Sequence, residues 1–282
     1  MKVSIITVCF NAYEDLKKTM DSILLIDYID FEYIIIDGGS LDGTKELLDE
    51  YSHYFQQKQI KFQYISEKDK GTYDAMNKGV LISKGDWINF MNAGDSFYSS
   101  NILSELFSQT IDKEVGVLYG DTFQYYDFGS GIAQEKDYLK DSKTMPFCHQ
   151  SSFVKKELLL KYPFDLSYRI IADHNFFHQL RTANIKFQYI PIVISRYNGQ
   201  YGLSATHPLL LHKESLRVHH ITEKWYYPFS IIWVYLRYGW VQPFKKHMPK
   251  WITNTWMKYK RKYIKKQSLV SNKNGRVKKL IK

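Results

Sequence analysis

Residues 3–44 read VSIITVCFNAYEDLKKTMDSILLIDYIDFEYIIIDGGSLDGT, and this stretch decides the fold. It opens with an apolar, β-branched run at residues 3–8, which predicts a buried strand. Residues 13–26 follow with apolar side chains at helical spacing, and a second apolar run at residues 32–36 ends in Asp37-Gly38-Gly39-Ser40. The order strand, helix, strand predicts a βαβ unit with parallel strands.

The same alternation continues to residue 95. Helix-period segments at residues 43–55 and 73–81 alternate with apolar runs at residues 61–65 and 87–91, and the last run ends in Asn92-Ala93-Gly94-Asp95. Strands that alternate with helices in this way are typical of parallel sheets covered by helices. The sequence therefore predicts an α/β fold with a Rossmann-like, mainly parallel sheet flanked by helices.

The second half of the chain is less regular. Apolar runs predict strands at residues 115–119, 147–154, 186–190 and 193–197, and residues 171–180 predict a helix rich in polar side chains. Periodicity does not assign a topology to these elements. We expect them to complete the sheet and to form a second wall of a cleft.

The charge of the chain divides at residue 223. The 282 residues, 44% hydrophobic and 24% charged, suffice for a buried core and exclude a disordered chain. Residues 1–223 hold 23 basic and 29 acidic side chains, a net charge of −6, whereas residues 224–282 hold 16 basic and no acidic ones. We therefore expect two parts, a body over residues 1–223 and a basic helical tail over residues 224–282.

Cysteine content and hydropathy indicate the compartment. Cys9 and Cys148 belong to no CxxC pair, so a reducing environment is expected. The apolar N-terminus is too short for a signal peptide and fits a first strand better. The longest apolar stretch, residues 225–241, is 17 residues long and contains Arg237, so no transmembrane helix is expected.

Polar side chains follow the end of each of the first four predicted strands. They are Asn11, Asp37, Glu67 with Asp69, and Asp95. Parallel sheets bind ligands at the carboxyl ends of their strands, so these loops are expected to form one site. The alternative is that Asn, Asp and Gly stand there only because they favour turns.

Five segments together resemble glycosyltransferase family 2, which comprises inverting enzymes with the GT-A nucleotide-sugar fold. They are TVCFNAYEDLKKTMDSI (7–23), DGGSLDGT (37–44), SEKDKGTYDAMNKGVLISKGDWINFMNAGD (66–95), PFCHQSSFVKKELL (146–159) and SYRIIADHNFF (167–177). The resemblance covers residues 1–205, with a nucleotide-sugar half over about 1–120 and an acceptor half over about 121–223. It is greatest to bacterial hexosyltransferases that build capsular, colanic-acid or O-antigen polysaccharides.

The resemblance implies a set of donor-binding residues. They are Thr7, Phe10, Asn11, Asp37, Gly38, Ser40, Asp69, Lys70, Asp74, Asn77 and Asn92. A carboxylate such as Asp37 is a strong acceptor for a base N–H or a ribose hydroxyl. The alternatives are helix caps: Asp37 for the helix that begins near Gly43, and Asp69 with Thr72 for the helix that follows them.

The segment Asn92-Ala93-Gly94-Asp95 stands where the family carries an acidic metal-binding motif. Asn92 and Gly94 replace two of the acidic positions, which leaves Asp95 as the one carboxylate. Mg²⁺ takes oxygen ligands from water and phosphate, so one protein carboxylate can suffice. We expect a divalent cation, Mg²⁺ or Mn²⁺, at Asp95, bound weakly and together with the donor diphosphate.

Asp173 stands at the family's catalytic position. An inverting transfer needs a base that takes the proton of the acceptor hydroxyl. The alternative is that Asp173 is a helix N-cap. The resemblance also places four residues near the acceptor or the phosphates: His149, Gln150, Gly202 and Ser204.

Two histidines adjoin other reactive side chains: His149 follows Cys148, and His174 follows Asp173. Cys148 and His149 are adjacent, and neighbours on the predicted strand point to opposite faces, so they are not expected to form a nucleophile–base pair. His174, next to Asp173, is expected to face away from the site.

The tail interleaves Trp and Tyr with Lys and Arg, as interfacial membrane helices do. Each basic residue contributes about 1 kcal/mol of binding free energy at an anionic membrane surface. Summed over a third of the tail's basic residues, this would suffice for attachment. Nucleic acid is the competing partner, but no nucleic-acid motif accompanies the tail and the body is acidic; residues 268–282 are expected to be solvated.

The combined prediction is an inverting glycosyltransferase, cytoplasmic and peripherally bound to the inner face of the membrane. Its partners would be a nucleotide-diphosphate sugar, a lipid-linked glycan acceptor and anionic lipid, and no nucleic acid. The alternatives are a sugar nucleotidyltransferase, although no GxxxxGK loop is present, and a non-catalytic membrane- or nucleic-acid-binding protein.

Overall fold

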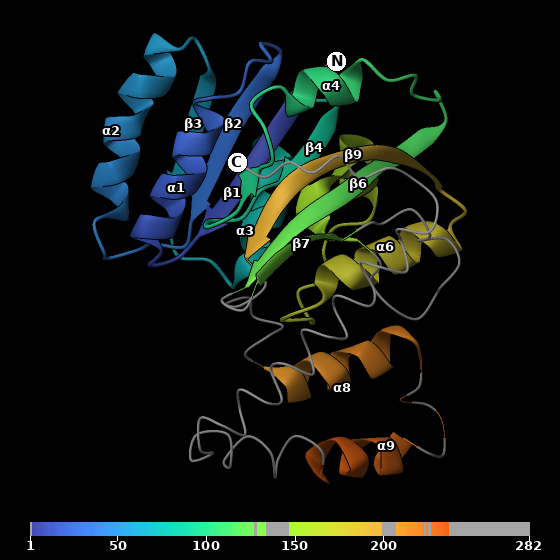
Figure 1. Cartoon of the computed structure of the whole chain (residues 1–282). Coiled ribbons are helices and arrows are strands. Elements are labelled where there is room, and N and C mark those ends of the chain that lie inside the picture. Colours follow the sequence, from blue (N-terminus) through green and yellow to red (C-terminus); the bar gives the residue numbers. More distant parts are fainter. Residues whose placement is uncertain are drawn as a thin grey trace.

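The computed structural model describes residues 2–126, 129–133, 147–198, 207–220, 222, 224 and 227–236. These residues form an α/β fold around a nine-stranded sheet (Figure 1). Its strands are β1 (Val3–Cys9), β2 (Phe31–Asp37), β3 (Lys61–Ser66), β4 (Trp87–Phe90), β5 (Ser96–Phe97), β6 (Val115–Tyr126), β7 (Gly129–Ala133), β8 (Ser152–Lys155) and β9 (Lys186–Asn198). The described helices are α1 (Tyr13–Ile23), α2 (Thr44–Gln57), α3 (Thr72–Ile82), α4 (Ile102–Phe107), the 3₁₀ turn η2 (His149–Ser151), α5 (Lys156–Lys161), α6 (Ala172–Thr182), α8 (Pro208–Val218) and α9 (Tyr227–Val234).

The first half of the sheet is parallel, in the order β3-β2-β1-β4. Alternate residues of β1 and β2 point to opposite faces, and both faces of these two strands are buried. On one face Ile5 and Ile35 pack with α1 and α2; on the other, Ile6 and Ile36 pack with α3. Because helices cover both faces, these strands are continuous apolar runs, which is why the sequence predicts them well.

The second half of the sheet is mixed, in the order β8-β6-β9-β5. β8 is antiparallel to both β4 and β6, and β9 is parallel to β6. Residues 186–190 and 193–197 are strand, as predicted, but they belong to one continuous strand, β9, and the break expected at Pro191 was wrong. Its pairing with β6 shifts register next to this proline, which has no N–H to donate.

The segment predicted as a strand over residues 147–154 begins with the turn η2, and β8 starts only at Ser152. The turn forms because His149 and Gln150 make contacts with side chains on other elements. The hydropathy pattern of the sequence gives no sign of these contacts.

The α/β class expected from the sequence is confirmed.

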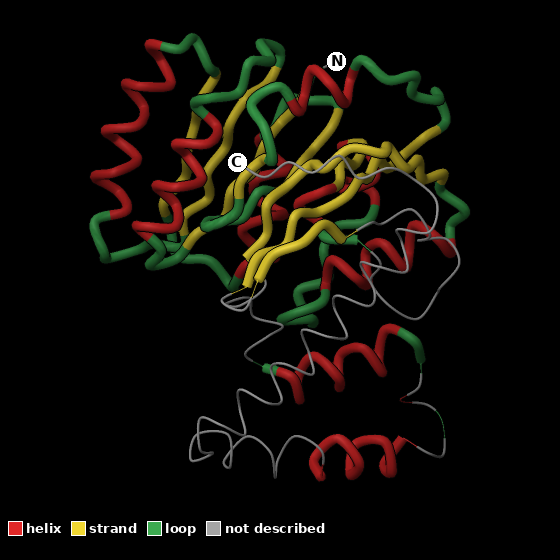
Figure 2. The backbone as a smooth tube through the Cα atoms, in the orientation of Figure 1, coloured by secondary structure: helices red, strands yellow, loops and turns green. Residues whose placement is uncertain are grey.

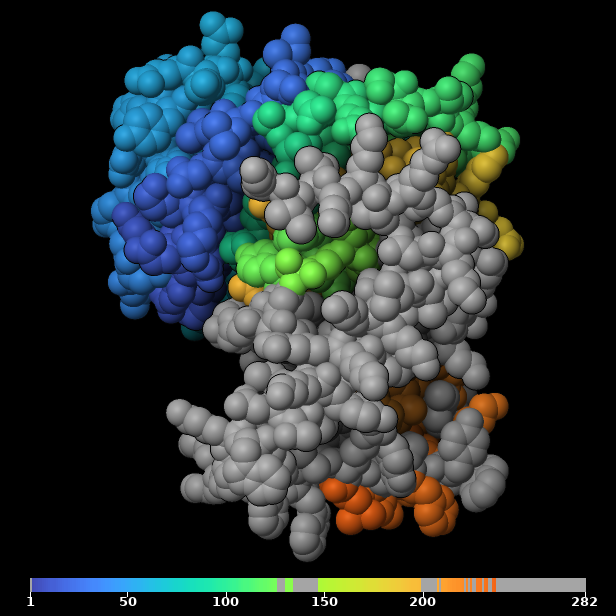
Figure 3. Space-filling model, in the orientation of Figure 1, coloured from blue at the N-terminus to red at the C-terminus, as the bar shows by residue number. Residues whose placement is uncertain are grey.

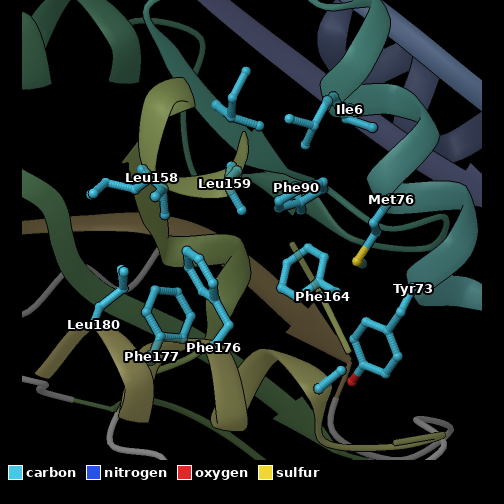
Figure 4. Packing of buried hydrophobic residues seen from close by; sticks show 14 of the residues in the cluster. Ile6, Tyr73, Met76, Phe90, Leu158, Leu159, Phe164, Phe176, Phe177 and Leu180 are labelled. Carbon is cyan, nitrogen blue, oxygen red and sulfur yellow. The ribbon is translucent and has the colours of Figure 1, made fainter. Parts of the chain in front are cut away.

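One apolar cluster extends from Ile6 of β1 and Phe90 of β4 to the side chains of α5 and α6 (Figure 4). Phe164 packs against Tyr73 of α3, Phe90 of β4 and Phe176 of α6, with its ring centroid within 5.5 Å of each of theirs, and Phe177 packs against Phe176. This cluster joins α3, α5 and α6 and fixes the start of α6 relative to α3.

α8 and α9 lie on the side of the sheet at which the parallel strands end (Figures 1 and 2). α8 packs on α6, with Leu216 and Val218 buried, and α9 packs on α8. α9 leaves large apolar side chains at the surface, and Figure 3 shows this helix at the lower edge of the molecule. Across the described ranges, no helix has the length and hydropathy needed to cross a membrane.

Candidate active site

Asp37, at the end of β2, is completely buried, and both of its carboxylate oxygens accept hydrogen bonds. The backbone N–H of Ser40 donates at 3.0 Å, and the hydroxyls of Ser40 and Ser66 donate as well. Asp37 does not cap α2: the N-cap is Gly43, and Asp42 accepts the bonds of Thr44, so that alternative was wrong. In this structure Asp37 shapes the loop that follows β2.

The loop after β1 is joined to the loop after β2. Asn11, at a left-handed φ of 47°, donates its backbone N–H to the Ser40 hydroxyl at 2.7 Å, and its Oδ1 accepts the N–H of Leu41 at 3.0 Å. Thr7 lies further inside, where its hydroxyl donates to the carbonyl of Met91 at 2.6 Å. Asn11 and Ser40 therefore form the surface of this edge, while Thr7 supports it from the core.

Gly38 lies between two side chains of neighbouring loops. A Cβ at this position would stand 2.8 Å from Asp69 Oδ2 and 3.2 Å from the ring of Phe10. The Phe10 ring itself is 63% exposed. Phe10, Gly38 and Asp69, all predicted to bind the donor, are thus brought together with Asn11 and Ser40 along one rim.

The loop before α3 is held by its own carboxylates. Asp69 Oδ1 accepts the N–H of Gly71 at 2.7 Å, and Asp74 Oδ2 accepts the N–H of Lys70 at 3.0 Å. The N-cap of α3 is Gly71 and has no side-chain cap bond, so the alternative that Asp69 and Thr72 cap this helix was wrong. Asp69 Oδ2 lies next to Gly38, so this turn contributes Asp69 to the rim.

Asn77 faces away from this rim. Its amide exchanges two hydrogen bonds with the backbone of Phe164, at 2.9 Å and 3.0 Å. It therefore connects α3 to the segment that precedes α6. Its predicted contact with the donor stays a prediction, and in this structure its amide serves this connection.

Asp95, which follows β4, is buried. Gln150 Nε2 donates to its Oδ2 at 2.6 Å, and the N–H of Asn198 donates to its Oδ1 at 3.3 Å. Burial raises the pKa of Asp95 to about 6, although the bonds from Gln150 and Asn198 and the nearby His149 favour the charged form. Gln150, predicted to lie near the acceptor or phosphates, thus contacts the predicted metal ligand.

Asn92 and His149 face each other next to Asp95. Asn92 Nδ2 lies 3.1 Å from His149 Nε2, and Asn92 Oδ1 is buried with no hydrogen-bond partner in the described part of the chain. Within those same residues, no cluster of three or more His, Cys, Asp or Glu side chains is placed to hold a metal. Any cation here would take most of its ligands from elsewhere.

Asp173 is the centre of the second wall. His149 Nδ1 lies 3.1 Å from its Oδ2, and its Oδ1 accepts from the hydroxyl of Tyr73 at 3.0 Å and from the N–H of His174 at 2.9 Å. Burial favours the neutral acid, but the bonds from His149, the His174 backbone and Tyr73 lower the pKa of Asp173. The carboxylate is therefore ionised at neutral pH and able to accept a proton.

Asp173 is not a helix N-cap, so that alternative was wrong. The N-cap of α6 is Ile171, and Asp173 lies in the first turn. The ring of His174 lies against that of His219, at 5.3 Å between centroids, away from His149. The Cys148 thiol donates to Gln150 Oε1 at 2.6 Å while His149 contacts Asp173, so Cys148 and His149 have separate partners, as expected. The reason differs from the predicted one, because the segment is a turn.

Sequence reasoning missed Tyr73 and Glu214. Tyr73 touches Asp173, and Glu214 of α8 accepts three backbone N–H groups just before α6. Tyr73 stands within the quoted segment at residues 66–95, which was the one available signal; Glu214 lies in a helix with no such signal. Gly202, Ser204 and the tail beyond residue 236 lie outside the described residues.

A family model described as "Glycosyl transferase family 2" matches residues 4–171. A relative from Mycobacterium bovis, named "PGL/p-HBAD biosynthesis glycosyltransferase", is 31% identical over 218 residues, which cover 76% of this chain and 82% of the relative. A glycosyltransferase named GlyG from Streptococcus pneumoniae is 25% identical over 124 residues, 44% of this chain and 40% of its own length.

Two solved structures share the fold. The mannosyltransferase PcManGT from Pyrobaculum calidifontis, in complex with GDP-Man and Mn²⁺, has a TM-score of 0.59 at 16% identity and matches 77% of this chain and 64% of its own. TarS of S. aureus, in complex with UDP-GlcNAc, has a TM-score of 0.58 at 16% identity over 73% of this chain and 61% of its own. These similarities show a GT-A-type arrangement of the sheet.

Proposed function

The chain belongs to glycosyltransferase family 2, and from that premise we propose that it is an inverting transferase. It moves a sugar from a nucleotide-diphosphate donor to a hydroxyl of a lipid-linked glycan, in the synthesis of a bacterial surface polysaccharide. One observation carries the proposal: a buried, ionised Asp173 is held by His149 and Tyr73 next to the loops that follow the parallel strands.

Asp173 acts as the general base. It takes the proton of the acceptor hydroxyl while that oxygen attacks the anomeric carbon of the donor sugar. The bond from this carbon to the diphosphate oxygen breaks, and the nucleoside diphosphate leaves with the electron pair. A single displacement inverts the anomeric centre. His149 and Tyr73 keep the carboxylate pointed at the hydroxyl, and the low pKa of Asp173 keeps it unprotonated until the transfer.

The rim around Gly38 binds the nucleotide. The exposed Phe10 ring offers a face on which a base can stack, and Gly38 and Asp69 lie directly beside this ring. Asp37 holds this loop in place through Ser40. The solved relatives of the same fold bind GDP-Man and UDP-GlcNAc, which supports a nucleotide-sugar donor.

A divalent cation, Mg²⁺ or Mn²⁺, fits beside Asp95. Asn92, whose carbonyl accepts the N–H of Asp95 at 3.0 Å, would offer its Oδ1, which has no partner among the described residues, as a second oxygen ligand. A cation would favour the ionised form of Asp95, whose pKa burial has raised. Because the protein offers few ligands, the donor diphosphate and water supply the rest. When bound, the cation neutralises charge on the departing diphosphate.

The acceptor is presented at a membrane. α9 exposes Phe229 and Ile232, spaced three residues apart and therefore on one helix face, and Tyr235 and Leu236 just after it are exposed as well. The segment that contains α9, residues 224–282, carries 16 basic side chains and no acidic ones. α9 lies on the same side of the sheet as the active-site loops (Figure 1), so a membrane bound there would bring a lipid-linked glycan toward Asp173.

The test is a panel of nucleotide sugars without acceptor. We expect slow release of UDP or GDP from one of them, increased by Mn²⁺ and detected by coupled assay or mass spectrometry. Release of pyrophosphate from a nucleoside triphosphate and a sugar phosphate would instead indicate a nucleotidyltransferase and refute the proposal. Flotation on anionic liposomes tests the membrane part: a chain truncated after residue 223 should float less than the full chain.

A further inference from the structure

A buried carboxylate on α8 faces the segment that leads into α6. Glu214 is 5% exposed. Its Oε1 accepts the backbone N–H of Arg169 at 2.8 Å, and its Oε2 accepts those of Ile170 and Ile171 at 3.0 Å and 3.2 Å. Three consecutive amides thus converge on one side chain. Ile171 is the N-cap of α6 and cannot cap the helix with its own side chain, so Glu214 places a negative charge at this helix terminus.

The segment held by Glu214 leads directly to Asp173, two residues after Ile171. On its other side the hydroxyl of Tyr73 lies 2.5 Å from the carbonyl of Ile170 and 3.0 Å from Asp173 Oδ1. The peptide before α6 is therefore fixed from two elements, α3 and α8. Its orientation determines where the first turn of α6 directs the Asp173 carboxylate.

A second side chain of α8 holds the residues just upstream. The guanidinium of Arg217 stacks over the ring of Tyr168, 3.6 Å from its centroid, and donates to the hydroxyl of Ser167 at 2.7 Å. Arg217 follows Glu214 by three residues, so both lie on one face of α8. α8 thus contacts the backbone or side chains of five successive residues, 167–171.

From these contacts we propose that Glu214 is a positioning residue for the transfer reaction. By accepting three amides in charge-assisted bonds, it fixes the start of α6 and so the place of Asp173 relative to His149. Glu214 does not touch Asp173 and takes no proton itself. The inference rests on the proposed function of Asp173 as the base, and assigns to α8 a share in its geometry.

The variant Glu214→Gln tests this role because it keeps the size of the side chain and one acceptor oxygen. The other oxygen becomes an NH₂ group, which cannot accept from a backbone N–H. We expect kcat for donor hydrolysis to fall about 10- to 100-fold, the size expected for a misplaced catalytic group. The Kd for UDP or GDP, measured by calorimetry, should stay within about twofold, because Glu214 makes no contact with the nucleotide loops.

Glu32→Gln is the matched control. Glu32 is also buried, at 3% exposure, and accepts from the Ser4 hydroxyl at 2.6 Å and from the backbone N–H of Lys84. It lies near the start of β2, at the edge of the sheet opposite the site. Both variants should lower the melting temperature, since each disturbs a buried carboxylate. Only Glu214→Gln should lower kcat.

Amide hydrogen exchange supplies a readout that does not depend on turnover. In Glu214→Gln the amides of residues 169–175 should exchange faster, and in Glu32→Gln they should not. Faster exchange there with wild-type kcat, or an equal loss of kcat in both variants, would overturn the positioning role and leave the proposed function intact. Absence of donor turnover in the wild type would overturn the proposed function, and the positioning role with it.

Discussion

The rim of loops after β1, β2 and β3 and the wall around Asp173 are built from different kinds of contact. At the rim, partners are close in sequence or lie in loops that leave adjacent strands, as Asn11 and Ser40 do. At the wall, three contacts between side chains join distant elements: Asn92 with His149, His149 with Asp173, and Tyr73 with Asp173. A rim of short loops on parallel strands follows from the fold, whereas the wall depends on how separate helices pack.

Replacement of Asp173 by Asn should have the largest effect on donor turnover. It should leave nucleotide binding at the rim unchanged. The amide keeps the shape but cannot accept a proton, so donor turnover should fall about 10²–10⁴-fold. Steady-state kinetics on the best donor measures this, with the Kd for UDP or GDP as the control for the rim. Near wild-type turnover would exclude Asp173 as the base.

Gly38→Ala should weaken nucleotide binding at the rim and leave the contacts of Asp173 unchanged. The added methyl meets Asp69 and Phe10 at 2.8 Å and 3.2 Å, so we expect a loss of about 1–3 kcal/mol in the free energy of unfolding and weaker UDP or GDP binding. Gly131→Ala is the control, because nothing lies within 4 Å of its added Cβ. Nucleotide affinity equal to the wild type would contradict nucleotide binding beside Gly38.

Asp95 should make the stability of the protein depend on pH. Its pKa is raised from 3.8 to about 6, so its contribution favours folding below pH 4 and is lost as pH rises through 6. Between pH 5 and pH 8 the wild type should lose about 1.5 kcal/mol of unfolding free energy relative to Asp95→Asn.

Urea unfolding of both proteins at the two pH values measures this difference. Mn²⁺ with UDP should restore stability to the wild type at pH 8 and have less effect on Asp95→Asn. If the unfolding free energies of the two proteins change with pH in parallel, Asp95 is not the source of the pH dependence. If Mn²⁺ stabilises both proteins equally, Asp95 is not the metal ligand.

Glu67→Gln should have the smallest effect. Glu67 pairs with Lys78 at 2.7 Å, but its side chain is 56% exposed. Exposed pairs contribute little, so the change in unfolding free energy should stay below about 1 kcal/mol. A larger loss, measured by thermal unfolding, would mean that surface charges stabilise the rim more than its buried hydrogen bonds suggest.

The comparison of the two regions explains which predictions from the sequence succeeded. The strands predicted at residues 3–8 and 61–65 are β1 (Val3–Cys9) and β3 (Lys61–Ser66). Their apolar runs and the turns after them are local signals, and parallel strands carry whatever follows them to one edge. The grouping of Asn11, Ser40 and Asp69 near one edge could therefore be expected.

The wall could not be predicted in the same way. The polarity of His149 and Gln150 breaks the strand expected over residues 147–154, because their partners Asp173 and Asp95 lie on other elements. Asp173 was identified from a family resemblance, but its contacts with Tyr73 and His149 were not. Glu214 had no local signal, since a Glu in a helix is ordinarily an exposed residue.

The sequence by itself determined the alternation of strands and helices, the family, the rim of polar loops and the division of charge between body and tail. Each of these depends on residues near one another in the chain or on composition. The tertiary structure decided that Asp37 and Asn77 hold loops together, that Asp173 is ionised between His149 and Tyr73, and that α8 reaches the start of α6. The reason is that a buried hydrogen bond forms only where packing brings two segments to within about 3 Å of each other. The spacing of residues along the chain does not specify which distant segments meet in this way.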